Sequence, residues 1–207
     1  MKILTALVCR EVPTSNGALM QDTSSDDATP LRELGRRLIS TNPGGHLTFY
    51  HRDVRWWPRW FQIALVRALA AARSDEIVYA CSALDEEKGG QIFLLTERVA
   101  ILLTVSPIDR DFAEVVAATW SRSALTELCV IDAEQTTTPE GVQYTVSRME
   151  VVYAARAPLR LPLGDRWDRD AAAGVNRLYG DLLEDLIAPR GPSATGETQP
   201  RGARLVE

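Results

Sequence analysis

The chain has 207 residues, of which 45% are hydrophobic and 25% charged, and its net charge is −5 at pH 7. This length suffices for one domain with a complete core, and the composition is typical of a globular protein. The acidic balance argues against a nucleic-acid binder, which needs an excess of basic charge. No run approaches the ~18 apolar residues of a membrane span, so we expect no transmembrane helix.

The N-terminal 73 residues divide into two parts. Residues 1–30 are rich in Ser, Thr and Asp after a short apolar start, which predicts a flexible segment without a secretory signal. Residues 31–73 predict a helical arm. Leu31, Leu34 and Leu38 lie on one face of a first helix over 31–41, and Pro58 is well placed at the start of a second helix over 58–73.

Residues 91–105 (QIFLLTERVAILLTV) predict a hairpin with a polar break at residues 96–98. Both of its runs are apolar on both faces, so we expect other elements to cover both sides. Further strand patterns occupy residues 76–83, 114–120, 125–132, 142–146 and 149–153, with an irregular crossing segment over 158–164. About seven strands at regular spacing favour a sandwich or barrel.

The C-terminal part predicts one long amphipathic helix and a tail. Asp165 can cap a helix over residues 166–187, whose apolar stripe includes Val175, Leu178 and Leu182. Residues 188–207 are rich in Pro and Gly and predict a disordered tail.

Seven short strands followed by one helix resemble the pleckstrin-homology-like (PH-like) superfold, and the local match is nearest to bacterial PH-like domains. The resemblance covers residues 75–187 and leaves the N-terminal helices outside. It implies an α+β fold in which a seven-stranded antiparallel PH-like barrel or sandwich is capped by the C-terminal amphipathic helix. The matching residues are Asp75-Glu76 before the first strand, Leu95-Thr96 ending the second, Arg98 opening the third and Trp167 opening the final helix.

PH domains that bind phosphoinositides cluster Lys and Arg in the first strand, first loop and second strand. Here that loop is Asp85-Glu86-Glu87-Lys88, and its flanking strands carry no Lys or Arg. Like charge repels phosphate, so we do not expect phosphoinositide binding. Because the superfold also serves as a protein-docking platform, the resemblance implies a non-catalytic, cytoplasmic binding or scaffold module with a protein partner. Fold alone does not determine function.

The segment Arg55-Trp56-Trp57-Pro58-Arg59-Trp60-Phe61 is the strongest local anomaly. Trp and Arg are enriched in interface hot spots, which favours partner binding, and they also suit contact with a membrane surface. The alternative is that the aromatic residues pack the helical arm onto the sheet. We expect Phe61 and one or two tryptophans to be buried, and Trp56 or Trp57 to be exposed.

The final helix supplies a second set of candidate partner-binding residues. In peptide-binding PH-like domains, the groove lies between a sheet edge and the C-terminal helix, and the peptide adds as a strand. By this resemblance, the candidates here are Val175, Leu178 and Tyr179.

No cofactor, metal site or catalytic residue is predicted. His46 and His51 lie near Asp53 without further ligands or a nucleophile motif, and the three cysteines lack metal-ligand spacing. We expect Cys81 and Cys129 to be buried, reduced thiols, which suits a cytoplasmic protein. The alternative function is a small α+β enzyme or a small-ligand-binding protein with an apolar pocket, whose polar groups are His51 with Asp53, or Tyr144 with Tyr153.

Overall fold

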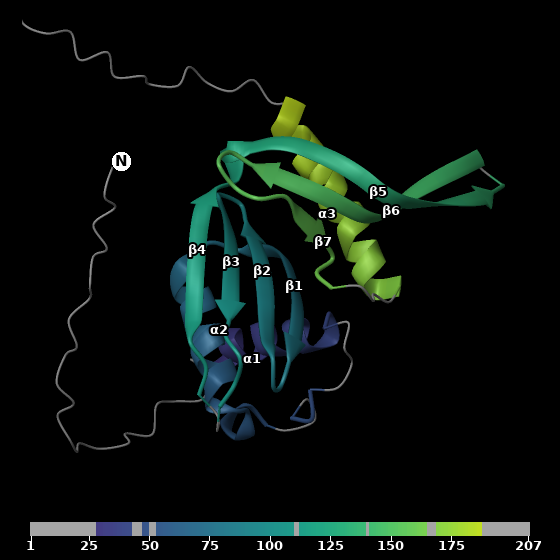
Figure 1. Cartoon of the computed structure of the whole chain (residues 1–207). Coiled ribbons are helices and arrows are strands. Elements are labelled where there is room, and N and C mark those ends of the chain that lie inside the picture. The colour runs from purple at the N-terminus through teal and green to yellow at the C-terminus, as the bar shows by residue number, and fades with distance from the viewer. Residues whose placement is uncertain are drawn as a thin grey trace, which may run out of the picture.

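The computed structural model describes residues 28–42, 47–49, 53–109, 112–139, 141–164 and 169–187. These residues form an α+β fold with two antiparallel sheets and three α-helices (Figure 1). None of the described helices is both long enough and apolar enough to cross a membrane. The elements in chain order are α1 (Ala28–Ser40), η1 (Val54–Trp56), α2 (Arg59–Ala72), β1 (Ile77–Asp85), β2 (Gly89–Thr96), β3 (Val99–Val105), β4 (Val115–Ser121), η2 (Arg122–Ala124), β5 (Leu125–Thr138), β6 (Gly141–Tyr153), β7 (Leu159–Leu161) and α3 (Arg169–Ile187).

The seven strands form a four-stranded sheet in the order β1-β2-β3-β4 and a three-stranded sheet in the order β5-β6-β7. The predicted α+β class, the strand count and the C-terminal helix are therefore confirmed. A closed barrel is not formed by the described residues, because no strand of the first sheet pairs with a strand of the second. The two sheets are joined at η2, where the chain turns from β4 into β5, and their facing side chains share one core.

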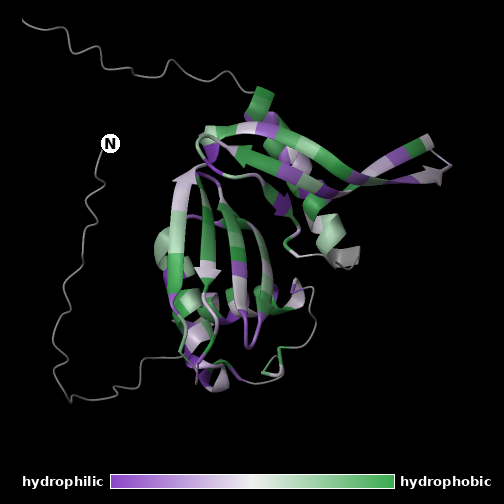
Figure 2. Cartoon of the chain, in the orientation of Figure 1, coloured by the Kyte–Doolittle hydropathy of each residue, from purple (hydrophilic) through white to green (hydrophobic). Residues whose placement is uncertain are grey.

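The predicted central hairpin is β2 and β3, and it is covered on both faces as its double apolar pattern predicts. Ile92 and Leu94 face α1 and α2, whereas Phe93 and Leu95 face the second sheet and α3. All four side chains are fully buried. Figure 2 shows hydrophobic residues along the strands of the first sheet. This sheet is the middle layer between two separate cores.

The helical arm covers one face of the first sheet. Leu34 and Leu38 of α1 and Phe61 and Leu65 of α2 are buried against that face. The end of α1 is attached to β1 by Asn42, whose amide Nδ2 donates to Leu84 O at 3.0 Å and whose Oδ1 accepts from Leu84 N at 2.7 Å. The two predicted helices are confirmed, although α1 begins earlier, at Ala28.

The last two strands differ from the prediction. Residues 142–146 and 149–153 belong to one continuous strand, β6, and the seventh strand is β7, inside the segment predicted to be irregular. The β5–β6 register shifts near Asp132, so Ala133 pairs with Val146 while Val130 pairs with Met149. An irregularity of this kind changes which side chains face the core without ending the strand. The alternation of apolar and polar residues is therefore interrupted between residues 146 and 149, and the sequence resembles two strands.

The C-terminal helix α3 packs on the second sheet. Val175, Leu178 and Leu182 are buried in the core between α3 and the two sheets. Asn176 Oδ1 accepts a hydrogen bond of 2.8 Å from Val146 N, which attaches α3 to β6. The predicted cap Asp165 and Trp167 lie outside the described residues.

Candidate partner-binding surface

The short helix η1 decides which tryptophan of the Trp/Arg segment reaches solvent. Asp53 Oδ1 accepts from Arg55 N at 3.4 Å, and Trp56 N donates to Asp53 O at 2.8 Å. This turn directs consecutive side chains to opposite sides, so Trp56 is 64% exposed while Trp57 is 4% exposed. The single predicted exposed aromatic of this pair is therefore Trp56.

The other aromatic residues of the segment pack inward. The rings of Trp57 and Phe61 lie 5.4 Å apart in an edge-to-face arrangement, and Trp60 packs edge-to-face on both Phe49 and Phe61. Such pairs contribute about 0.5–1.5 kcal/mol beyond area burial. Trp57, Trp60 and Phe61 thus attach the helical arm to the sheet, as the packing alternative predicts.

Around the start of α2, two arginines each lie over an exposed aromatic ring. The Arg55 guanidinium lies 5.8 Å from the Trp56 ring, and the Arg59 guanidinium lies 5.6 Å from the Phe112 ring. Phe112 is 60% exposed, and neither arginine has an ion-pair partner among the described residues. Arg55, Trp56, Arg59 and Phe112 are called the Arg–aromatic surface below.

Phe112 was not identified from the sequence, because it stands alone in a polar loop between two strands. It is positioned by a small backbone bridge in which Asp109 and Phe112 exchange two hydrogen bonds of 2.9 Å. The bridge places the ring directly before β4, which begins at Val115. The Arg–aromatic surface therefore adjoins the start of β4.

Strand β4 is an open edge of the first sheet. No described strand pairs with its outer side, and its seven residues, VVAATWS, carry no charge. Val116 is 54% exposed. Natural proteins usually protect such edges with charges, proline or a covering segment, since unpaired backbone groups invite another strand.

The other sheet edges are protected. Arg37 of α1 donates from its guanidinium to Ile77 O and to Val78 O, both at 2.9 Å, and so occupies the edge of β1. Strand β7 has only three residues. Strand β5 carries carboxylates along its length, from Glu127, Asp132 and Glu134. Among the described strands, β4 is thus the long edge without a charge.

The candidates on α3 lie within the molecule. Val175 is fully buried, Leu178 is 2% exposed, and Tyr179 is partly buried against the same core. Leu178 also lines a hollow of about 220 Å³ beside the β1 edge, whose other walls include Arg37 and Arg177. Because the sheets already cover Val175 and Leu178, these two side chains serve packing in this structure.

The residues proposed for the alternative enzyme are not brought together. His51 lies outside the described residues, and Asp53 caps η1. Tyr144 is 69% exposed on the far part of the β5–β6 hairpin, whereas Tyr153 is 2% exposed in the core. No cluster of three metal-binding side chains occurs among the residues that the structure describes.

The two described cysteines are free thiols. Cys81 is buried, and burial raises the pKa of its thiol to about 11, so it remains protonated at neutral pH. Cys129 is only partly buried, contrary to the sequence prediction, and its hydrogen bond to Glu127 raises its pKa. A nucleophilic cysteine needs a lowered pKa, so neither thiol has the environment of a catalytic group.

The chain matches no protein-family model, no curated protein and no solved structure.

Proposed function

We propose that this chain is a non-catalytic, cytoplasmic binding or scaffold module of PH-like architecture that docks a protein partner. Two features support the architecture: a four-stranded sheet followed by a three-stranded sheet, and a C-terminal helix packed on both. In addition, the residues that carry the resemblance, Asp75, Thr96 and Arg98, meet at the β2–β3 turn.

The partner proposed here is an extended segment with acidic residues, which adds to β4 as a fifth strand. The observation that carries this proposal is the uncharged, unpaired edge of β4 beside the Arg–aromatic surface. Backbone hydrogen bonds along the edge supply affinity, and side-chain contacts beside it supply specificity. Arg55 and Arg59 attract carboxylates, and Trp56 offers a large apolar anchor of the kind that dominates interface energies.

A phosphoinositide partner is not favoured at the β1–β2 turn. Asp85 Oδ1 accepts from Glu87 N and Lys88 N, both at 2.9 Å, and these hydrogen bonds hold the pKa of the Asp85 carboxyl below its ordinary value. Asp85 is therefore ionised at neutral pH. A negative carboxylate in this turn repels the phosphates that basic PH domains bind there.

The docking proposal is tested by panning a display library of random linear peptides on the intact chain. The expected sequences combine β-forming residues with Asp or Glu. The test variant is Arg55→Ala/Trp56→Ala/Arg59→Ala, which leaves the buried Trp57 untouched, and it is expected to bind the selected peptides at least about tenfold more weakly. The control variant Val66→Ala/Arg67→Ala removes two other exposed side chains, from α2, and is expected to bind normally.

Hydrogen exchange locates the bound peptide. Strand addition is expected to slow amide exchange in residues 115–121 and to leave the β1 edge unchanged. Peptides without acidic residues, or unchanged exchange in β4, would contradict the proposal. Flotation of the intact chain with anionic vesicles, lost in the same triple variant, would instead assign the Arg–aromatic surface to a membrane.

A further inference from the structure

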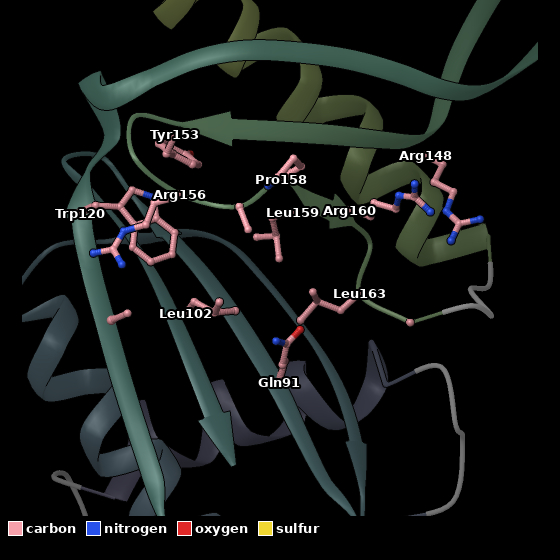
Figure 3. Close-up of a pocket in the computed structure, with 13 residues that line it drawn as sticks. Gln91, Leu102, Trp120, Arg148, Tyr153, Arg156, Pro158, Leu159, Arg160 and Leu163 are labelled. Carbon is pink, nitrogen blue, oxygen red and sulfur yellow. The ribbon is translucent and has the colours of Figure 1, made fainter. Parts of the chain in front are cut away.

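A cavity of about 510 Å³ opens between the two sheets, away from β4's outer edge and from the Arg–aromatic surface. Figure 3 shows its floor on β2, β3 and β4 and its roof on the end of β6, the following loop and β7. This volume lies within the range of roughly 300–1,000 Å³ for small-molecule sites. The cavity exists because the sheets diverge instead of closing into a barrel.

About half of the cavity wall is apolar. Leu102 and Ala118 project from the first sheet, and Leu159 and Leu163 face them from β7 and the segment after it. Trp120 forms one end of the wall, with its ring 5.6 Å from that of Tyr153. The indole Nε1 of Trp120 is buried and has no hydrogen-bond acceptor among the described residues. An apolar ligand body can therefore pack against these leucines and the Trp120 ring.

The charges that line the cavity are all positive. Arg148, Arg156 and Arg160 contribute to its wall, and none of the described lining residues is Asp or Glu. Arg160 is paired with Glu150, just outside the lining, at 3.1 Å. The Arg156 guanidinium lies 5.3 Å from the Trp120 ring and has no ion pair among the described residues. This accumulation is notable in a chain whose net charge is −5.

We propose that this cavity binds a small amphiphilic carboxylate, with its apolar body against Leu102, Leu159 and Leu163 and its carboxylate on Arg156. Burial of the apolar body drives binding, at about 25 cal/mol per Å² of apolar surface. The guanidinium suits a carboxylate because it offers parallel N–H donors and stays charged at any physiological pH. A cation is repelled by the same arginines, and an uncharged amphiphile leaves Arg156 without its partner.

This site is independent of the docking surface. The cavity is lined by the inner face of β4, through Ala118 and Trp120, whereas the docking proposal uses the outer edge of that strand. If the peptides fail to bind, the cavity proposal is unaffected. If the carboxylate fails to bind, the docking proposal is unaffected.

Isothermal titration calorimetry of the intact chain tests the ligand class with three probes that share one alkyl body. Decanoate, titrated below its critical micelle concentration, is expected to bind saturably at one site. Decanol and decyltrimethylammonium are expected to bind at least about tenfold more weakly, since a charge-assisted hydrogen bond contributes roughly that factor. Equal affinities for the three probes, or absence of saturable decanoate binding, would overturn the proposal.

Two variants locate the bound carboxylate. Arg156→Met removes the charge but keeps an apolar stem against Trp120, and it is expected to weaken decanoate binding by about tenfold while leaving decanol binding unchanged. Ala118→Phe fills part of the cavity and is expected to weaken both probes. Arg67→Met removes an exposed arginine from α2, on the opposite layer, and serves as the control.

Each variant is compared with the parent by thermal unfolding before titration. If Arg156→Met does not fold, two results still test whether the cavity binds the carboxylate. They are the comparison of Ala118→Phe with the parent and the three-probe series. Unchanged decanoate affinity in a folded Arg156→Met or Ala118→Phe variant overturns the assignment. Binding to phosphatidylglycerol vesicles without binding to monomeric decanoate also overturns it, since the ligand is then a membrane.

Discussion

At the scale of single residues, the β2–β3 turn is held by a small polar network. Arg98 Nε donates to both carboxylate oxygens of Asp75, at 3.0 and 2.9 Å, and Thr96 Oγ1 accepts from Val99 N at 2.9 Å. The hydrogen bond from Arg98 lowers the pKa of the Asp75 carboxyl. The network joins Asp75, shortly before β1, to Thr96 and Arg98 in the turn, 21 and 23 positions later in the sequence.

Asp75→Asn is expected to lower the thermal unfolding midpoint at pH 7, with a loss that fades in acid. The folded-state pKa of Asp75 lies below its unfolded value, which is about 3.8. Its contribution is therefore complete above that unfolded value and disappears as the pH falls through the folded pKa. Unfolding midpoints of parent and variant between pH 7 and pH 3 check this, with Glu76→Gln as an exposed neighbouring control. A gap that stays constant with pH would contradict the role of ionised Asp75.

At the scale of elements, the packing of α1 against Trp57, the residue that follows η1, depends on one glycine. A Cβ added at Gly35 would overlap Cζ3 and Cη2 of Trp57 and would lie 3.1 Å from Leu65 Cδ1. Trp57 is itself buried against Phe61, so it has little room to move. The absence of a side chain at Gly35 is thus what lets the two parts of the helical arm approach one another.

Gly35→Ala is expected to lower the free energy of unfolding by about 1–3 kcal/mol through overpacking, although alanine is the better helix former. The matched control is Gly180→Ala in α3, where an added Cβ meets nothing within 4 Å. That substitution is expected to raise the free energy of unfolding by about 0.5–1 kcal/mol. Urea unfolding of both variants measures the difference, and a stabilising Gly35→Ala would show that Trp57 is not fixed.

At the scale of the whole molecule, the first sheet separates two cores. The helix-side core contains Ile92 and Leu103, and the other core contains Phe93, Leu95 and residues of β6 and α3. Arg122 of η2 forms an ion pair with Asp185 of α3, which connects the corner between the sheets to the end of the helix. The position of α3 therefore depends on both sheets.

Leu178→Ala is expected to cost about 2–5 kcal/mol of unfolding free energy, because it leaves a cavity between α3 and the sheets. Leu183→Ala changes a 38% exposed leucine on the same helix and is expected to cost about 0.5 kcal/mol or less. Denaturant unfolding compares the two. A small effect of Leu178→Ala would instead favour an open groove along α3. The sequence resemblance implies that Leu178 lines such a groove.

The sequence by itself determined most of the elements. Double-faced apolar runs predicted the hairpin of β2 and β3 and its burial, spacing of leucines predicted α1, and Pro58 marked the start of α2. These signals are local, because side-chain periodicity and turn residues act within a few positions of one another. The same reasoning could state that one tryptophan of the pair Trp56 and Trp57 is exposed, but not which one.

The tertiary structure decided what depends on distant pairing. The register shift near Asp132 lets two alternating segments of the sequence continue as one strand, β6. Pairing with β6, including Met149 with Leu161, makes residues 159–161 a strand. The edge of β4 became the open edge only because Arg37 occupies the other one. Trp120, Arg156 and Leu102 line one cavity although no local pattern relates them. Strand order and the spacing between sheets arise from long-range packing, and periodicity within one segment carries no information about them.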